Sequence, residues 1–309
     1  MKTGVTAVII LLATTVVMSG GVAVTASAEP GFSNESADEI TVLIELEEID
    51  SFDSRQNLQS QVRNHQTPLI EYLDSVEGVT VTHQFWIVNK ISATVNTDKT
   101  SVERIENHSS VQRVVRDQTV QTPVVENTVT EASTGRTDVT YGLDQIDAPE
   151  AWEAFDTRGR NVTVAVIDNG INPNHDALRL NNGNTTNNYE TAWHTNYYPN
   201  GSFIRTPTHR EGAAAPRPFD SNGHGTHVSG TIAGSNATGT AIGVAPDSRL
   251  IHSVALYNGF GSVSTVTQSL EWVAEQHPDV VTMSLGGESP SETQLRTINN
   301  LYLVYVWTI

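Results

Sequence analysis

The strongest constraint on the fold is a series of short, mostly apolar runs in the second half of the chain. Residues 162–167, 250–256 and 280–285 are such runs, and stretches with helical character begin at His224 and span residues 265–276. Strands that are buried on both faces and separated by helices are typical of a parallel sheet. We therefore predict an α/β fold with a doubly wound parallel sheet for residues 140–309.

A polar residue follows the first of these runs at the place where function is expected. In open α/β sheets, ligands and reacting groups gather at the carboxyl ends of the strands. Asp168 comes directly after the run 162–167, so it is predicted at that edge. The Asn-, Thr- and Tyr-rich residues 180–218 have weak periodicity and are predicted to be a long surface loop.

The first half of the chain has a different pattern, which predicts a small α+β domain over residues 29–121. The order of its elements, strand-helix-strand-strand-helix-strand, is the ferredoxin-like arrangement. The segments are residues 40–46, 55–74, two strands within 79–95 with a turn near Asn89, then 100–107 and 111–120. Residues 122–139 are polar and are predicted to be a linker to the second domain.

The N-terminus has the pattern of an export signal. Lys2 precedes an apolar run over residues 5–17, and Ala26-Ser27-Ala28 is a small-residue cleavage site. We predict a signal peptide over residues 1–28 and a secreted, extracellular product. The alternative is an uncleaved anchor, for which Gly20-Gly21 and the polar residues beyond are poorly suited.

The composition excludes several classes of function. There are 35 acidic against 17 basic residues, so an unmodified surface repels nucleic acid and anionic membranes, and we expect neither as a partner. Only three of the basic residues are lysines, and an acidic, lysine-poor chain suits a halophilic source. The absence of cysteine excludes disulfides, thiolate metal sites and cysteine nucleophiles.

Asp168 and His224 are the candidate catalytic residues. A serine hydroxyl is a poor nucleophile until an imidazole takes its proton, and the imidazole needs a carboxylate that fixes its tautomer. Gly170 allows a tight turn after Asp168, and Gly223 and Gly225 allow the backbone beside His224 to pack closely. Two other interpretations exist. Asp168-Asn169-Gly170 can be a plain turn, and His224 and His227 can be two ligands of a metal ion. We expect His227 to be a buried, hydrogen-bonded histidine.

Four motifs in order resemble the subtilisin-like serine proteases, and the acidic composition resembles the halolysin-like members. They are Asp168-Asn169-Gly170, Gly223-His224-Gly225-Thr226-His227-Val228, Gly243-Val244-Ala245-Pro246 and the segment 280–287. The resemblance implies hydrolysis of peptide bonds in protein or peptide substrates, with Asp168 orienting His224 and His224 acting as general base. It also implies that residues 29–121 are a propeptide, which would make the chain a zymogen with its own propeptide as a partner.

The same resemblance assigns two walls of a substrate cleft. Ser284, Leu285 and Gly286 would form one wall, and Gly259, Phe260 and Gly261 the other, with a peptide bound between them as an added strand. Without the family pattern, these segments are a plain strand end and a glycine-rich turn. No cofactor is required; calcium is common in the family, but its ligands cannot be carried over to this sequence.

Two catalytic elements of the family pattern are missing from the 309 residues. The sequence contains neither an Ala-Gly-Asn segment for the oxyanion hole nor a Gly-Thr-Ser-Met-Ala segment with the nucleophile. We therefore expect a C-terminally incomplete subtilisin-like domain that is inactive, unprocessed and poorly soluble alone, with residues 302–309 as a β-prone, aggregation-prone end. The alternatives are a non-catalytic inhibitor of the propeptide type and a peptide-binding module.

Overall fold

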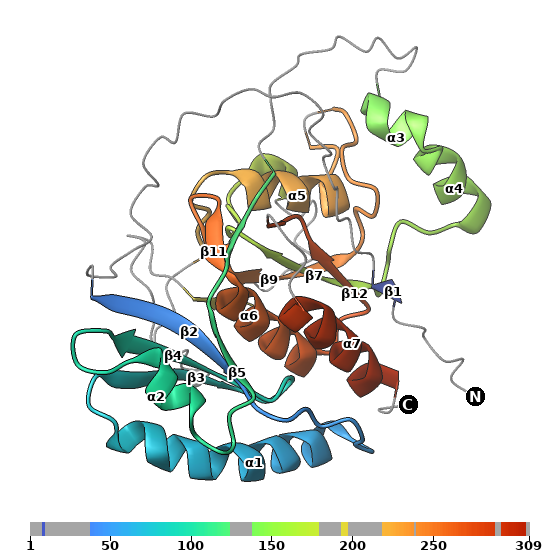
Figure 1. Cartoon of the computed structure of the whole chain (residues 1–309). Helices are drawn as coiled ribbons and strands as arrows, with labels where there is room; N and C mark the ends of the chain where they lie inside the picture. Colours follow the sequence, from blue (N-terminus) through green and yellow to red (C-terminus); the bar gives the residue numbers. More distant parts are fainter. Residues whose placement is uncertain are drawn as a thin grey trace, which may run out of the picture. The chain divides into compact units, whose positions relative to one another are not determined.

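The computed structural model describes residues 8–9, 38–123, 138–178, 193–196, 218–237, 239–287 and 292–306 (Figure 1). The chain divides into two compact units. Unit 1 comprises residues Met1–Leu12, Gln121–Gly259 and Trp272–Leu285. Unit 2 comprises residues Ala13–Val120, Phe260–Glu271 and Gly286–Ile309. Each unit is described by itself.

Unit 1 is built on a five-stranded sheet of order β1-β12-β7-β9-β8, in which every pairing is parallel. Its strands are β1 (Val8–Ile9), β7 (Thr163–Asp168), β8 (Trp193–Thr195), β9 (Arg249–Val254) and β12 (Val280–Met283). The central strands β7 and β9 are almost entirely buried, because helices cover both of their faces. The parallel sheet predicted from the apolar runs is confirmed.

Strand β8 shows that helices pack on both faces of this sheet. Neighbouring residues of a strand point to opposite faces. Trp193 packs in one apolar cluster with Val228 and Ile232 of α5 (His224–Ala233), whereas the ring of His194 stacks on Trp272 at 5.5 Å. Trp272 belongs to the last turns of α6 (Val263–Gln276), so the sheet is doubly wound as predicted.

The remaining elements of unit 1 are short. They are α3 (Tyr141–Gln145), α4 (Ala148–Phe155), the 3₁₀ turn η1 (Asp176–Leu178) and β10 (Leu256–Tyr257). Val139 forms an isolated bridge with Ala241, which ties the start of this segment to the loop after α5.

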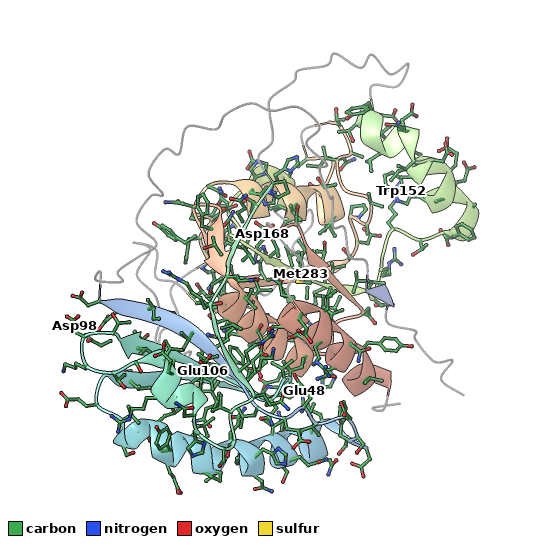
Figure 2. All side chains as sticks on the ribbon, viewed as in Figure 1. Glu48, Asp98, Glu106, Trp152, Asp168 and Met283 are labelled. Atoms are coloured by element: carbon green, nitrogen blue, oxygen red, sulfur yellow. The ribbon has the colours of Figure 1, made fainter. Side chains whose placement is uncertain are left out.

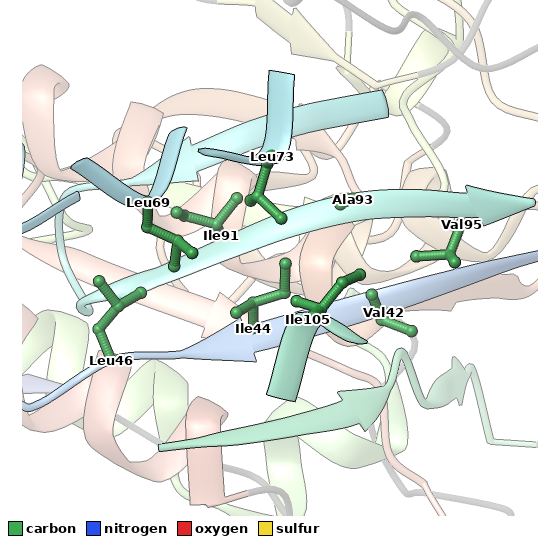
Figure 3. Close-up of a cluster of buried hydrophobic side chains, with 9 residues drawn as sticks. All are labelled: Val42, Ile44, Leu46, Leu69, Leu73, Ile91, Ala93, Val95 and Ile105. Carbon is green, nitrogen blue, oxygen red and sulfur yellow. The ribbon is translucent and has the colours of Figure 1, made fainter. Parts of the chain in front are cut away.

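Unit 2 contains a four-stranded antiparallel sheet of order β3-β4-β2-β5 with two helices. The element order is the predicted strand-helix-strand-strand-helix-strand, as β2 (Glu39–Glu45), α1 (Arg55–Ser75), β3 (Val79–Phe85), β4 (Lys90–Asn96), α2 (Val102–Glu106) and β5 (Arg113–Arg116). Figure 3 shows the core between sheet and helices, formed by Val42, Ile44, Leu46, Leu69, Leu73, Ile91, Ala93, Val95 and Ile105. Ser54 begins α1 and accepts a hydrogen bond from the backbone N–H of Asn57, as an N-cap should.

Unit 2 also includes the first two residues of β6 (Thr119–Gln121), β11 (Phe260–Ser262), the first part of α6 and α7 (Glu292–Val306). The carboxylate of Glu271 in α6 accepts hydrogen bonds from the backbone N–H groups of Trp86 and Ile87 and pairs with His83 at 2.8 Å. Buried Lys90 donates to Glu45 at 2.7 Å and to Thr293 of α7 at 2.9 Å. Buried polar groups are costly unless they are bonded, so these contacts fix how the small domain meets both helices.

Several boundaries differ from the sequence predictions. The single closing strand expected over residues 111–120 is divided into β5 and β6, and β8 lies within the stretch expected to be only a loop. Residues 302–306, part of the end expected to be β-prone, continue α7, because Thr293, Thr297, Asn300 and Leu301 are buried at helical spacing. Most of the predicted linker, residues 124–137, lies outside the described residues. So does the predicted export signal apart from β1.

Candidate active site

Asp168 is the last residue of β7 and is fully buried (Figure 2). Its Oδ1 accepts a hydrogen bond from the backbone N–H of Asn169 at 2.7 Å. The Nδ1 atom of His224 lies 2.9 Å from Oδ1 and 3.0 Å from Oδ2. Residues 56 positions apart are thus joined at the carboxyl edge of the sheet, where the sequence predicted Asp168.

Close packing of glycines brings His224 to that edge. His224 is the first residue of α5, and a Cβ atom at Gly225 would lie 2.0 Å from the carbonyl oxygen of Gly170. Gly170 itself has φ +121° and leaves no room for a Cβ beside the carbonyl oxygen of Phe219. The predicted need for glycine at both positions is confirmed.

The N-terminus of α5 is held by side chains from the preceding loop. Oδ1 of Asp220 accepts from the N–H groups of Asn222 and Gly223 at 3.2 and 2.9 Å, and Oδ2 accepts from the N–H of Thr226 at 2.7 Å. Oδ1 of Asn222 accepts from the N–H of His224 at 3.0 Å. Because the N-cap residue Gly223 has no side chain, Asp220 and Asn222 satisfy the free N–H groups of the first turn in its place.

Electrostatics around the pair favour a protonatable imidazole. The hydrogen bond to Asp168 is the largest influence on His224 and, with the nearby charges of Asp168 and Asp220, raises its pKa above 6.5 despite partial burial. Burial is the largest influence on Asp168 and raises its pKa, while the hydrogen bond from His224 acts in the opposite direction. None of the described residues forms a hydrogen bond with Nε2 of His224, so that nitrogen can accept a proton.

The predicted cleft walls lie in part beside this pair. Ser284 and Leu285 follow β12 directly, and Met283 pairs with Ile167 in the parallel sheet, so they reach the same edge as Asp168. On the other side, the N–H of Gly259 donates to Oδ1 of Asn169 at 3.1 Å. Phe260 and Gly261 lie in β11, and Gly286 is exposed; all three belong to unit 2.

The expectation for His227 was wrong, since its side chain is exposed. Helix α5 buries Gly225, Ser229, Gly230 and Ala233, and position 227 falls on the opposite side of the helix. No group of three or more His, Cys, Asp or Glu residues that could hold a metal ion occurs in the described part of the chain. Among those same residues, no helix is both long and apolar enough to cross a membrane.

Sequence reasoning did not assign roles to Asn169, Asp220 and Asn222. All three stand inside the motifs that surround Asp168 and His224, and Asp and Asn just before a helix are a recognisable capping signal. That signal identifies Asp220 and Asn222. The partners of Asn169 lie 53 and 90 positions away along the chain, beyond the reach of any local pattern.

Comparison with known proteins agrees with this geometry. Residues 159–308 match the family model described as "Subtilase family". This region belongs to the subtilase family. The chain is 33% identical over 226 residues to Subtilisin E of Bacillus subtilis (strain 168), covering 72% of this chain and 49% of that protein.

Other relatives give the same result. A subtilisin from Bacillus pumilus is 36% identical over 162 residues, covering 52% of this chain and 49% of the relative. An alkaline protease from Alkalihalobacillus alcalophilus is 34% identical over 171 residues, covering 55% of this chain and 38% of the relative. The chain therefore spans about half, or less, of the length of these relatives.

Solved structures share the fold. The epidermin leader peptide processing serine protease (EpiP) from Staphylococcus aureus aligns with a TM-score of 0.56 at 16% identity, covering 87% of this chain and 59% of that chain. Fervidolysin from Fervidobacterium pennivorans, a keratinolytic enzyme related to subtilisin, aligns with a TM-score of 0.51 at 18% identity. The alignment covers 85% of this chain and 38% of the fervidolysin chain. These likenesses establish the subtilisin-like α/β fold.

Proposed function

We propose that this chain supplies the carboxylate and the general base of a secreted, halophilic subtilisin-like endopeptidase. The observation that carries the proposal is the pair of contacts, 2.9 and 3.0 Å, from His224 Nδ1 to the buried carboxylate of Asp168. The acidic composition and the N-terminal export pattern support the halophilic and secreted parts.

In this proposal Asp168 holds the proton on Nδ1 and stabilises the imidazolium that forms. Nε2 of His224 then takes the proton of a serine hydroxyl and later gives it to the leaving amine. The 309 residues contain no Gly-Thr-Ser-Met-Ala segment, and the proposal assigns the nucleophile to none of their serines. We accordingly expect the 309-residue polypeptide alone to hydrolyse no peptide bond.

The substrate in this proposal binds as an added strand at Gly259. The carbonyl oxygen of Gly259 already accepts a hydrogen bond from the N–H of Thr122 at 2.9 Å, as main-chain strand addition requires. A peptide or unfolded protein segment offers the same donors regardless of its side chains. This contact therefore supports proteins and peptides as the substrate class.

The role of residues 29–121 in this proposal is that of a propeptide, which makes the protein a zymogen. Support comes from the separate apolar core of the four-stranded sheet and from the acceptor Glu271, which binds two backbone N–H groups of the β3–β4 connection. The linker over residues 122–139 is the expected site of processing.

A fusion protein tests the catalytic proposal. Residues 1–287 are joined to the serine-bearing C-terminal part of Subtilisin E, and hydrolysis of a chromogenic peptide anilide is measured in high salt. The fusion should hydrolyse the substrate, and the 309-residue chain should not. In subtilisin, replacing the histidine or the aspartate lowers kcat by about 2 × 10⁶ and about 3 × 10⁴; His224→Ala and Asp168→Ala fusions should show losses of that order. Unchanged hydrolysis by both variants would refute the assignment.

A second candidate function, inhibition of another subtilase, follows from the same contacts in unit 2. If the small domain binds a subtilase surface through a carboxylate like Glu271, the polypeptide of residues 29–121 should inhibit Subtilisin E at nanomolar concentration. A variant with Trp86→Pro, which lacks one of the two N–H donors, should inhibit more weakly. Equal inhibition by both polypeptides would show that this contact does not carry the binding.

A further inference from the structure

Asn169 follows Asp168 and is completely buried, and its side-chain amide is bonded at both ends. Oδ1 accepts from the N–H of Gly259 at 3.1 Å, and Nδ2 donates to Oδ1 of Asn222 at 2.9 Å. A buried amide with both ends bonded has a fixed orientation, since rotating it would leave polar atoms without partners. One side chain thus joins the Gly259 turn to the loop before α5.

The Asn222 end of this bridge reaches His224 directly. Oδ1 of Asn222 accepts both the Nδ2 hydrogen of Asn169 and the backbone N–H of His224. The same loop has a second bond to Asn169, from the N–H of Ser221 to the carbonyl oxygen of Asn169 at 3.5 Å. A displacement of the Asn169 amide therefore displaces the acceptor that holds the first residue of α5.

The Gly259 end of the bridge is the turn at which the proposed function places the substrate strand. Asn258 and Gly259 have φ values of +50° and +92°, two consecutive left-handed residues as in a type I′ turn. The carbonyl oxygen of Gly259 accepts from Thr122, while its N–H donates to Asn169. Asn258 adds a bond from its N–H to Oγ of Ser221 at 2.8 Å. The turn at residues 258–259 thus bonds both to Thr122 and to the loop before His224.

We propose that Asn169 is a positioning residue that couples peptide binding at Gly259 to the placement of His224 beside Asp168. The inference rests on the proposed function, because it takes Gly259 as the peptide-binding wall. Serine at position 169 would offer a hydroxyl one bond closer to the backbone than the amide atoms of Asn169. Such a hydroxyl donates and accepts from a single oxygen, whereas the amide of Asn169 uses two separate atoms, Nδ2 and Oδ1, for the two loops.

The test uses the 309-residue chain and needs no hydrolysis. Thr122→Pro removes the N–H that bonds Gly259, and Thr122→Ala, which keeps it, is the matched control. Each is made in three backgrounds: unchanged, Asn169→Ser, and Asn222→Ala. Because Asn222 is exposed, its replacement leaves the core intact. The readout is the NMR titration midpoint of His224 in ¹³C-histidine-labelled protein, assigned with a His224→Gln variant.

In the unchanged background, Thr122→Pro should lower the His224 midpoint, because the loosened loop weakens the bond to Asp168, and Thr122→Ala should not. In both Asn169→Ser and Asn222→Ala this response should be smaller, because the bridge through Asn169 is then broken and the bond from Asn258 to Ser221 still joins the turn to the loop. A response of equal size in all three backgrounds, or none in the unchanged one, would overturn the coupling. The result is independent of the fusion assay: an inactive fusion with the expected titrations would refute the proposed function and leave the coupling standing.

Discussion

Gly225→Ala should show how tightly α5 must approach β7 for the Asp168–His224 pair to form. A Cβ atom at position 225 would lie 2.0 Å from the carbonyl oxygen of Gly170, whereas real Cβ atoms essentially never approach within 3.0 Å. The helix must therefore retreat by at least 1.0 Å (3.0 − 2.0). A retreat of that size lengthens the 2.9 Å contact between His224 Nδ1 and Asp168 Oδ1 to about 4 Å, beyond hydrogen-bond range.

The energetic cost follows from the two effects together. Overpacking a close-packed site costs about 1–3 kcal/mol, and loss of a hydrogen bond to a buried charged group adds about 1.5–3 kcal/mol. We expect destabilisation of about 3 kcal/mol or more, which lowers the Tm by roughly 6–12 °C. The assay is thermal and urea unfolding followed by circular dichroism in high salt.

Gly230→Ala is the matched control in the same helix. A Cβ atom there would meet only Cδ1 of Ile242, at an ordinary 3.7 Å. Since alanine favours a helix over glycine by up to about 1 kcal/mol, this variant should be as stable as the unchanged chain or more so. Equal unfolding midpoints for the Gly225 and Gly230 variants would refute the argument from close approach.

Two further predictions concern buried groups. His252 is fully buried with neither ring nitrogen bonded, and burial lowers its pKa to about 3. Its folded-state pKa is thus below the ordinary 6.5, so its contribution to stability is present above about pH 6.5 and lost as pH falls toward 3. The free energy of unfolding, from urea titrations, should fall between about pH 7 and about pH 4.5 by about 2 kcal/mol less in His252→Leu than in the unchanged chain. An equal fall in both would contradict the burial argument. Glu271→Ala leaves two backbone N–H groups without their acceptor and should destabilise unit 2 by about 1–3 kcal/mol. Glu275 is exposed on the same helix, so Glu275→Ala should change the free energy of unfolding by less than about 0.5 kcal/mol. Equal effects of the two substitutions would contradict the assigned contacts.

The sequence predicted the elements that carry Asp168 and His224 because both depend on local pattern. A continuous apolar run predicts a buried strand, and the strand ends where Asp168 begins the turn. Helix α5 was also predicted, although its buried face consists of Gly225, Ser229, Gly230 and Ala233 rather than large apolar residues. That small-residue face is why the burial of His227 was predicted wrongly.

Other features depend on contacts that no local pattern encodes. Residues 302–309 are β-prone by composition, yet tertiary burial of one helical face extends α7 as far as Val306. Strand β8 has only three residues, which is too short for a periodic signal. The bridging role of Asn169 requires Asn222 and Gly259, which only the folded chain brings together.

The central claim, that Asp168 holds His224 as a general base, is tested most directly by titrating His224 in the unchanged chain and in Asp168→Asn. Because the hydrogen bond and charge of Asp168 raise the pKa of His224 above 6.5, the stability that this pair contributes is fully present below about pH 6.5 and is lost as pH rises through the folded-state pKa. The ¹⁵N spectrum of the neutral ring should show the proton on Nδ1, and Asp168→Asn should lower the midpoint. An unaltered midpoint and tautomer in Asp168→Asn would contradict the account.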